Sequence, residues 1–375
     1  MTPEARAGLQ RAFPYSQSSH QATTVLTQRL CEEIEASGPI SFQNFMARAL
    51  YDEQDGYYVN LDRRPISRHG DFITSVSVGP TFGLLLSERI SRLHESLGSP
   101  EDFAIVEIGA HDGTLAQDIR AAGQTHPYHI IEPLEKPRGL LEKNLTDLPN
   151  VHIHAAPEKV AQTGILIANE VLDALPVPLL IFSQGAWQLA GVGIADNLKE
   201  KDGPALDFCL MPDLPADLKQ LTADLGTDYP DGYVTEGPPA LESFLKPHLD
   251  LFDEGLFLFI DYGLDQDSLY HPGRTVGTLR CYRQQSQKTH PLDLVGQQDL
   301  TADVNFTAVE KVARQLGLTP NPVMNQSRYL THCAKKWLLQ QPGPSPDQIR
   351  QFQTLIHPSQ FGNRFYALEL EKQQS

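Results

Sequence analysis

The stretch Phe103-Ala-Ile-Val-Glu-Ile-Gly-Ala-His-Asp-Gly-Thr-Leu115 decides the fold of this chain. Its apolar run stops at Gly109, which is typical of a buried parallel strand, and a helix is expected from Thr114. Gly109 and Gly113 let the backbone turn tightly and approach a ligand that a Cβ would push away. The stretch therefore predicts a strand, a ligand-binding loop and a helix in succession.

A carboxylate in the next apolar run indicates a ligand that contains a nucleoside. Glu132 lies 23 residues after Gly109, at the end of the run that starts at Tyr128. At this spacing a carboxylate can accept hydrogen bonds from both hydroxyls of an adenosine ribose. The two features together favour a nucleotide-cofactor site over the alternative, an ordinary strand, turn and helix of an α/β core.

The loop between the two glycines indicates which cofactor binds. A dinucleotide fingerprint needs G-x-G-x-x-G to seat a pyrophosphate, whereas here three residues, His111 in the middle, separate Gly109 from Gly113. A diphosphate would also meet the carboxylates of Asp112 and Glu107. Negative charge suits a ligand with an ammonium and a sulfonium, so the loop favours S-adenosylmethionine and disfavours NAD-dependent redox chemistry.

Apolar runs predict a doubly wound α/β sheet of the Rossmann-like, class I methyltransferase type. The candidate strands are 103–108, 128–132, 151–154, 164–168 and 256–260. The gap of about 85 residues before the last strand is too long for one crossover helix. It predicts an inserted β-rich subdomain at about 180–250, with a hairpin over 179–194 and a helix over 240–251.

The first hundred residues precede this sheet and are expected to be helical. Apolar residues recur there at helical spacing and predict one buried stripe, formed by Phe82, Leu85, Leu86, Ile90, Leu93 and Leu97. We therefore expect two regions. Residues 1–100 form an N-terminal helical region that completes the cofactor pocket, and residues 101–375 form the methyltransferase domain with its insertion.

Composition narrows the class of partner. The chain has 375 residues, 40% of them hydrophobic, and a net charge of −17. This charge disfavours nucleic acid and anionic membranes, and fits a basic protein or peptide. The four cysteines show no C-x-x-C spacing, so a reducing compartment is expected and no zinc site is indicated. Neither a secretory signal nor a membrane span is predicted.

A second group of polar residues ends the fourth strand, in Ile165-Leu-Ile-Ala-Asn-Glu-Val-Leu-Asp-Ala-Leu-Pro176. Asn169 and Glu170 should emerge at the sheet edge beside Gly109, and Asp173 should share a helix face with Glu170. A sulfonium methyl is already activated, so alignment of the acceptor is the main task and no metal is required. We predict these three residues to be catalytic. The alternative is that the two carboxylates only charge a helix N-terminus.

Several segments together resemble the MidA family of S-adenosylmethionine-dependent methyltransferases. They follow the same order from about residue 30 to 370: Gly38-Pro-Ile-Ser-Phe42, Gly56-Tyr-Tyr58, Gly70-Asp-Phe-Ile-Thr-Ser75, 167–176, Ile260-Asp-Tyr-Gly263, Asp299-Leu-Thr-Ala-Asp-Val-Asn-Phe306 and Pro358-Ser-Gln-Phe-Gly-Asn-Arg-Phe365. That family includes bacterial proteins and a mitochondrial complex I assembly factor that methylates an arginine. The resemblance implies that Gly70, Asp71, Thr74 and Ser75 lie at the cofactor pocket.

The resemblance also implies methylation of an arginine side chain, in a respiratory-complex subunit or another basic protein. Two departures from the family pattern motivate an alternative. His111 replaces the middle glycine of the usual Gly-Pro-Gly-x-Gly loop, and Ser77 stands where the family usually has a glutamate. The alternative function is an assembly scaffold that keeps the methyltransferase fold with weak or no activity.

The expected compartment is the bacterial cytoplasm, with the mitochondrial matrix as the alternative. Arg6, Arg11 and Arg29, against the single acid Glu4 in the first 30 residues, are compatible with a transit segment.

Some other polar residues have competing interpretations. His152 and His154 share a strand face but no third metal ligand is evident, so a packed or solvent-facing pair is favoured. Asp261 and Tyr262 either wall the substrate pocket or shape the turn that follows the fifth strand.

Overall fold

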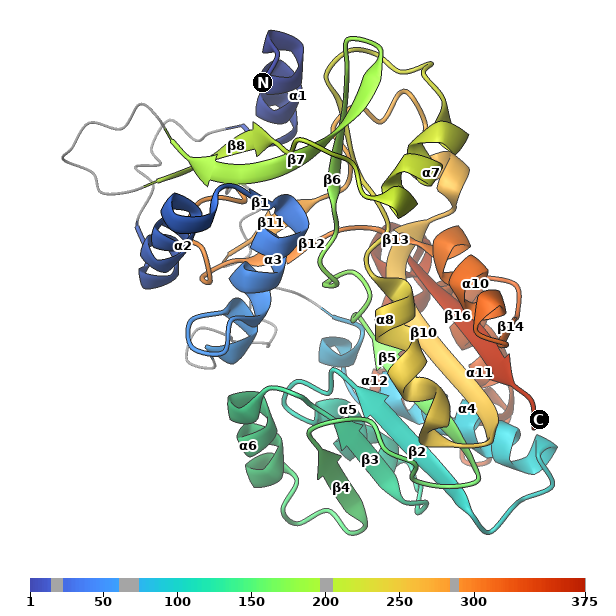
Figure 1. Cartoon of the computed structure of the whole chain (residues 1–375). Helices are drawn as coiled ribbons and strands as arrows, with labels where there is room; N and C mark the ends of the chain where they lie inside the picture. The colour runs from blue at the N-terminus through green and yellow to red at the C-terminus, as the bar shows by residue number, and fades with distance from the viewer. Residues whose placement is uncertain (15–22, 61–73, 196–204, 284–289, 375) are drawn as a thin grey trace. The chain divides into compact units, whose positions relative to one another are not determined.

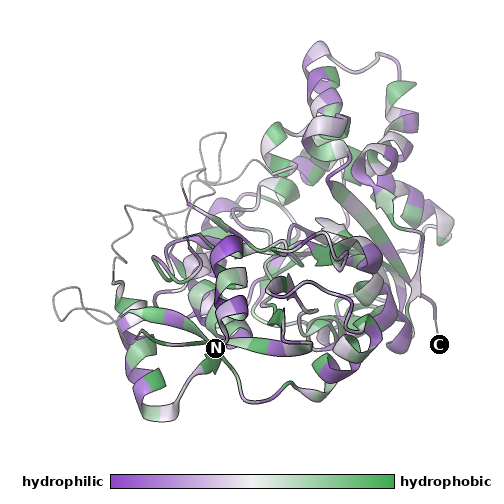
Figure 2. Cartoon of the chain, turned by 90° about the horizontal axis from the view of Figure 1, so that it is seen from above, coloured by the Kyte–Doolittle hydropathy of each residue, from purple (hydrophilic) through white to green (hydrophobic). Residues whose placement is uncertain are grey.

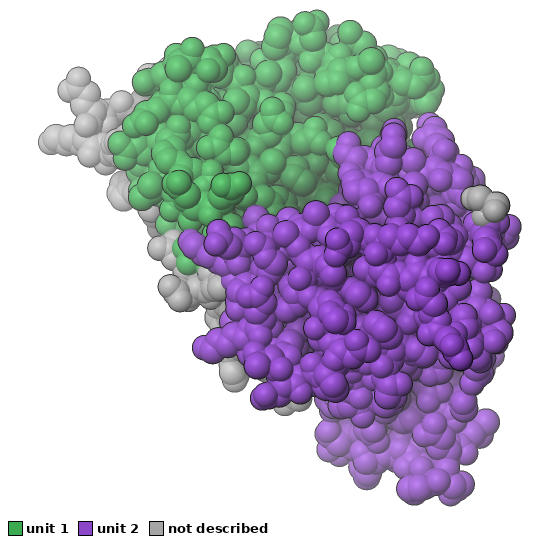
Figure 3. Space-filling view, turned by 60° about the horizontal axis from the view of Figure 1, so that its bottom comes forward, with its two compact units in different colours: residues 1–65, 174–240, 264–305 green, residues 66–173, 241–263, 306–375 purple. Residues whose placement is uncertain are grey.

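The computed structural model describes residues 1–14, 23–60, 74–195, 205–283 and 290–374 (Figure 1). These residues form two compact units, coloured separately in Figure 3. Unit 1 comprises residues 1–65, 174–240 and 264–305, and unit 2 comprises residues 66–173, 241–263 and 306–375. The predicted division at residue 100 stays a prediction, and the compact units are built from segments that alternate along the chain.

Unit 2 contains the large sheet. The strands of unit 2 are β2 (Phe103–Ile108), β3 (Tyr128–Ile131), β4 (Val151–His154), β5 (Thr163–Asn169), β10 (Glu254–Leu264), β14 (Thr319–Pro320), β15 (Met324–Asn325) and β16 (Phe365–Lys372). Its helices are η3 (Val76–Val78), α4 (Thr81–Ser96), α5 (Thr114–Ala121), α6 (Glu135–Asn144), α8 (Leu241–Leu245), η4 (Lys246–Leu251), α10 (Phe306–Gln315), α11 (Gln326–Leu338), α12 (Pro346–Ile356) and the π-helical η5 (Pro358–Gly362).

The strand order of this sheet is β14-β16-β10-β5-β2-β3-β4. The strands from β4 to β10 run parallel and β16 is antiparallel to β10. All five predicted strands are confirmed, and so is the predicted class of fold. Parallel strands that are covered on both faces are mostly apolar, and β2 is buried at each of its six positions, of which only Glu107 is polar.

Helices cover the sheet and bury its core. Figure 1 shows α8 in front of β10, with α4 and α11 behind it. The predicted stripe on α4 is buried in this core at every position except Leu97, which is partly buried against it. The helices carry hydrophobic and hydrophilic residues side by side in Figure 2, as expected for helices with one face on a core.

Unit 1 is a mixture of helices and short strands. Its helices are α1 (Pro3–Ala12), α2 (Val25–Ser37), α3 (Phe42–Tyr51), η1 (Tyr57–Val59), α7 (Ala216–Leu225) and α9 (Gln266–Leu269). Its strands are β1 (Ile40–Ser41), β6 (Leu179–Ser183), β7 (Ala186–Ile194), β8 (Leu206–Leu210), β9 (Tyr233–Glu236), β11 (Arg280–Tyr282), β12 (Asp299–Thr301) and β13 (Val304–Asn305).

The predicted hairpin over 179–194 is confirmed as β6 and β7. It turns at Gln184 and Gly185, both with positive φ, as a two-residue hairpin turn requires. These strands join β1, β8 and β9 in one sheet. The predicted helix over 240–251 exists as α8 followed by the 3₁₀ helix η4, since Pro247 interrupts the α-helical hydrogen-bond pattern, and it belongs to unit 2.

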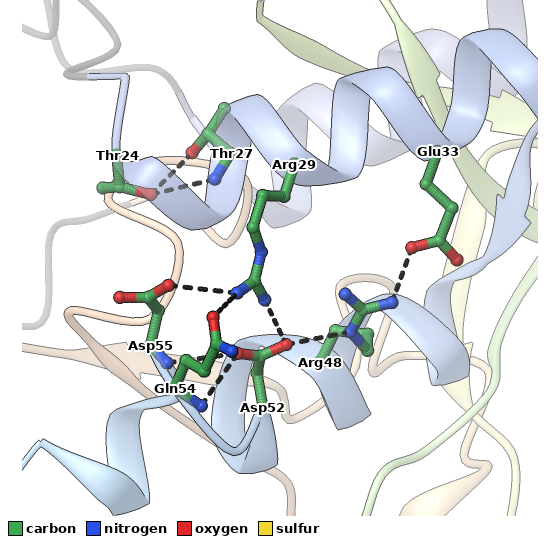
Figure 4. Close-up of polar contacts among 8 residues, drawn as sticks. All are labelled: Thr24, Thr27, Arg29, Glu33, Arg48, Asp52, Gln54 and Asp55. Carbon is green, nitrogen blue, oxygen red and sulfur yellow. Dashed lines mark hydrogen bonds and ion pairs between the residues drawn. The ribbon is translucent and has the colours of Figure 1, made fainter.

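An ion-pair network joins α2 to the end of α3 in unit 1 (Figure 4). Arg29 and Arg48 both bind the carboxylate of Asp52, which caps α3, while Arg48 also binds Glu33 at 2.6 Å. Burial opposes the ionised form, yet the bond from Arg29 lowers the pKa of Asp52 below its ordinary value. The network therefore fixes the start of the loop that leads to η1.

Candidate active site

The sheet of unit 2 brings four strand ends to one edge. Ile108 of β2 pairs with Ile131 of β3 and with Ala168 of β5, and Asn169 of β5 pairs with Ile260 of β10. Since these strands are parallel, the residues that follow each of them lie along the same carboxyl edge. This is the edge where doubly wound sheets bind ligands.

The loop after β2 alternates left-handed residues. Gly109, His111 and Gly113 have φ values of 71°, 52° and 85°. Gly109 is exposed, and a Cβ there would lie 2.7 Å from a methyl carbon of Val171. The loop is thus a cradle of bare backbone that a side chain at Gly109 would fill. His111 occupies a conformation that glycine adopts without strain, which explains why glycine is usual there.

The rest of the loop is fixed by local hydrogen bonds. The Gly113 amide donates to the Ala110 carbonyl at 2.8 Å, and Asp112 accepts bonds from the amide and hydroxyl of Thr114. Burial opposes ionisation of Asp112, but the bonds from His111 and Thr114 lower its pKa to about 2. The loop therefore carries a full negative charge, which suits a cationic ligand.

Glu107 is predicted to contact the cofactor, and the structure shows its carboxyl turned into the protein. It is 3% exposed and accepts a 2.6 Å bond from the hydroxyl of Tyr128. Burial raises the pKa of Glu107 to about 7. The described contact of this side chain is thus with Tyr128, and its predicted role toward the cofactor stays a prediction.

Glu132 stands directly after β3. Its amide donates to the His154 carbonyl at 2.9 Å, and its carboxylate accepts a 2.9 Å bond from the Leu134 amide. The side chain is half-buried at the same edge as the glycine loop. Its position fits the predicted bonds to ribose hydroxyls.

The structure brings Asn169 and Glu170 together at the end of β5. Glu170 has a φ of 54°, and its carboxylate accepts bonds from the Asn169 amide group at 3.1 Å and the Ser75 backbone amide at 3.2 Å. The carboxylate is enclosed by protein, so desolvation and then repulsion from Asp173 raise the pKa of Glu170 to about 8. The side-chain oxygen of Asn169 is buried without a hydrogen-bond partner in the described structure.

Of the residues that the family resemblance implied, Gly70 and Asp71 lie outside the described residues. Ser75 is fully buried, and its hydroxyl donates to Gln326 at 3.1 Å. The Thr74 amide donates to the Ser77 hydroxyl at 2.9 Å. Ser77, which stands in place of the family glutamate, therefore closes a local turn.

Asp261 and Tyr262, near the end of β10, are hydrogen-bonded to the segment that carries Glu170 and Asp173. One oxygen of Asp261 accepts bonds from three consecutive amides, those of residues 171–173. The Tyr262 hydroxyl donates to the carboxylate of Asp173. The sequence signal for this arrangement was an apolar strand that ends in polar residues at the same edge, but only the structure shows the bonds.

The histidines of β3 and β4 stack with one another. His129 lies 5.0 Å from His152 and 5.1 Å from His154, measured between ring centroids. A 2.9 Å hydrogen bond joins His129 to His154. In the described part of the chain, no group of three or more His, Cys, Asp or Glu side chains is arranged to hold a metal ion.

Fold and site together define an S-adenosylmethionine-dependent methyltransferase of class I. The model of the S-adenosyl-L-methionine-dependent methyltransferase family matches residues 85–323, more than half of the chain. The chain belongs to this family, as the resemblance to MidA proteins implied. Within the residues described, no helix has the length and apolar character to span a membrane.

Relatives and solved structures agree. The chain is 28% identical to "Protein arginine methyltransferase NDUFAF7 homolog, mitochondrial" of Drosophila melanogaster, over 92% of this chain and 84% of the relative. It is 26% identical to the Homo sapiens protein of the same kind, over 93% and 84%. A crystal structure from Burkholderia thailandensis, bound to S-adenosyl-homocysteine, is 25% identical with a TM-score of 0.80 and covers 100% of this chain and 95% of that one.

The cofactor is S-adenosylmethionine, and the residues present fit it. The bare backbone at Gly109 leaves room for the ligand, the charged Asp112 suits its cationic part and Glu132 suits its ribose. When bound, S-adenosylmethionine supplies an activated methyl group on sulfur. The protein's own contribution is to hold the acceptor in line and to exclude water.

Proposed function

We propose that this methyltransferase modifies the guanidinium group of an arginine in a protein substrate. The observation that carries the proposal is the group of acceptors at the end of β5, where Glu170 lies close to Asp173 and is bonded to Asn169, whose side-chain oxygen is buried with no hydrogen-bond partner among the described residues. A guanidinium offers five N–H donors in a fixed plane and stays charged at all relevant pH values. The curated relatives named as protein arginine methyltransferases support the same acceptor.

The raised pKa of Glu170 gives the site its chemistry. A carboxyl with a pKa of about 8 ionises when a guanidinium approaches, because the opposite charge favours the anion. The guanidinium nitrogen then forms a bond to the methyl carbon as the sulfur–carbon bond breaks, and the nitrogen afterwards releases one proton. We assign Glu170 as the acceptor of that proton, and Asn169 and Asp173 as groups that orient the guanidinium.

The experiment uses labelled S-adenosylmethionine and a lysate from a strain that lacks this protein. Proteins labelled by the full chain are hydrolysed, and the modified amino acid is identified by mass spectrometry. We expect methylarginine, and we expect Glu170→Gln to reduce labelling about 100-fold or more while it leaves S-adenosylhomocysteine affinity nearly unchanged. The matched control is Glu101→Gln, at an exposed position of the same unit. Label on lysine or on another residue type would contradict the proposal.

We also propose that the substrate is a basic protein, such as a subunit of a respiratory complex. The net charge of −17 supports a positively charged partner. The bacterial cytoplasm stays our proposed compartment, while the curated relatives carry mitochondrial names. The four cysteines, all free thiols, are compatible with either reducing compartment.

The alternative of an inactive scaffold is not favoured. His111 keeps the left-handed conformation that the cofactor loop needs, and Ser77 closes a local turn. Membership of a methyltransferase family and relatives named as methyltransferases both favour the enzyme.

A further inference from the structure

Asp261 occupies an unusual place for an aspartate. It is 1% exposed, and it follows Ile260, whose carbonyl accepts the Glu170 amide at 2.8 Å. Its Oδ2 atom accepts the amides of residues 171, 172 and 173 at 3.1, 2.9 and 3.2 Å. Its Oδ1 atom accepts the Tyr262 amide at 2.9 Å. One buried carboxylate thus binds four backbone amides from two neighbouring strand ends.

Asp173 is bonded to both Asp261 and its neighbour Tyr262. The Asp173 amide is one of the three that donate to Asp261, and the Asp173 carboxylate accepts a bond from the Tyr262 hydroxyl. The Tyr262 ring packs edge-on against Phe365 at 5.5 Å, which fixes the direction of the hydroxyl. The segment from Glu170 to Asp173 is therefore held at its backbone by Asp261 and at its last side chain by Tyr262.

The segment needs this support because it starts with a strained residue. Glu170 is a non-glycine residue with a φ of 54°, a conformation that persists only where the surroundings impose it. Without Asp261, three buried amides would lose their acceptor and the turn could relax. Relaxation would move the carboxylate of Glu170 away from Ser75 and Asn169.

We infer that Asp261 is a positioning residue for methyl transfer: its carboxylate fixes the turn 170–173 so that Glu170 and Asp173 face the acceptor. The inference rests on the proposed function, which assigns these two carboxylates to the acceptor. Asp261 itself is buried, and both of its carboxyl oxygens accept backbone amides. It acts through the geometry of the turn that it holds.

The surroundings of Asp261 disfavour its ionised form. Among the described residues, the titratable groups placed against it are Asp173 and Glu170, and Tyr262 is bonded to Asp173. Burial first, and then repulsion from these two carboxyls, raises the pKa of Asp261. Since the ionised form is disfavoured, the role of Asp261 rests on the hydrogen bonds that it accepts from the turn.

The test compares Asp261→Asn, Asp261→Ala and Tyr262→Phe with Asp253→Asn in the full chain. Asp253 is the matched control because its side chain is 47% exposed and it precedes the opposite end of the same strand. We expect Asp261→Ala to lower kcat about 100-fold, since a misplaced reacting group costs about this factor. Its affinity for S-adenosylhomocysteine should stay within about 3-fold, and the amides of residues 171–173 should exchange with deuterium faster.

Asp261→Asn keeps an oxygen acceptor for the three amides but removes the charge. We expect it to retain more activity than Asp261→Ala, because the turn keeps an oxygen acceptor. Equal losses of activity and S-adenosylhomocysteine affinity in Asp261→Ala would overturn the inference, and so would a kcat equal to that of Asp253→Asn. If the wild-type label is found on a residue other than arginine, the proposed function fails, while these ratios still test Asp261 with the true acceptor.

Discussion

The loop after β2 and the turn after β5 both reverse the chain sharply at the end of a parallel strand, but they use different residues to do so. Both leave a parallel strand through left-handed residues, and they lie close together, because a Cβ added at Gly109 would be 2.7 Å from Val171. The loop uses glycines and presents bare backbone. The turn uses Glu170, a strained side-chain-bearing residue, and binds its amides to the internal carboxylate of Asp261. If the proposed roles hold, the loop meets the cofactor chiefly with bare backbone, and the turn meets the acceptor with side chains.

Gly109→Ala should have the largest effect, because it replaces the bare backbone that distinguishes the loop from the turn. The added methyl fills the cradle, enforces strain at a φ of 71° and pushes Val171 in the neighbouring turn. We expect S-adenosylhomocysteine affinity to fall about 100-fold or more, measured by calorimetry, with a smaller loss of stability of about 1–2 kcal/mol. The control is Gly139→Ala, at a helical position of the same unit where a Cβ meets no atom within 4 Å. Unchanged affinity in Gly109→Ala would show that the ligand does not approach this backbone.

Glu132→Ala should have the second-largest effect on cofactor affinity. The loss of two charge-assisted bonds to a ribose lowers affinity by about 30-fold, and Glu132→Gln should recover only part of it. Both variants are measured by titration with S-adenosylmethionine. Glu135→Ala, three residues further along and exposed, serves as the control. Normal affinity in Glu132→Ala would leave Glu132 with only its bond to the Leu134 amide.

The two regions also differ in how far the sequence predicted them. The glycine loop follows from local spacing, because a strand, two glycines and a carboxylate 23 residues later all lie on consecutive elements. The turn follows only in part. Asn169 and Glu170 were predicted at the edge, but the acceptor of the 171–173 amides is a residue 88 to 90 positions away. Which residues meet at that distance depends on strand order and register.

The same reason explains two further limits of the prediction. The role of Glu107 toward the ligand stays a prediction, but its hydrogen bond with the buried hydroxyl of Tyr128 on β3 was not predicted. Composition shifts also gave no sign that residues 1–65 and 174–240 share one compact unit. Contacts between distant segments decide both features, and a single sequence does not display them.

Glu170→Gln should change how the free energy of unfolding depends on pH, which tests whether the turn buries a carboxyl with a raised pKa. Since the pKa of Glu170 is raised from 4.5 to about 8, the folded protein binds this proton more tightly than the unfolded chain. Glu170 therefore costs the wild type stability as the pH rises through this window, and the glutamine variant lacks this contribution. At pH 9 we expect Glu170→Gln to be more stable than the wild type by about 2 kcal/mol, measured by denaturant unfolding. A difference that is the same at pH 5 and pH 9 would contradict the raised pKa. Glu101→Gln should show no such dependence.

His111→Gly should have the smallest effect, and it asks whether the cofactor loop tolerates a side chain in its middle. Glycine relieves the strain at a φ of 52°, but it also makes the unfolded chain more flexible, so stability should change by less than about 1 kcal/mol. The imidazole nitrogen lies 3.6 Å from the Asp112 carboxylate, so its loss removes one group that favours the charged form of Asp112. We expect these effects to offset one another and S-adenosylhomocysteine affinity to change by less than about 3-fold. A large gain in affinity would mean that His111 crowds the ligand, and then the loop would differ from the turn in carrying a side chain that hinders rather than serves its function.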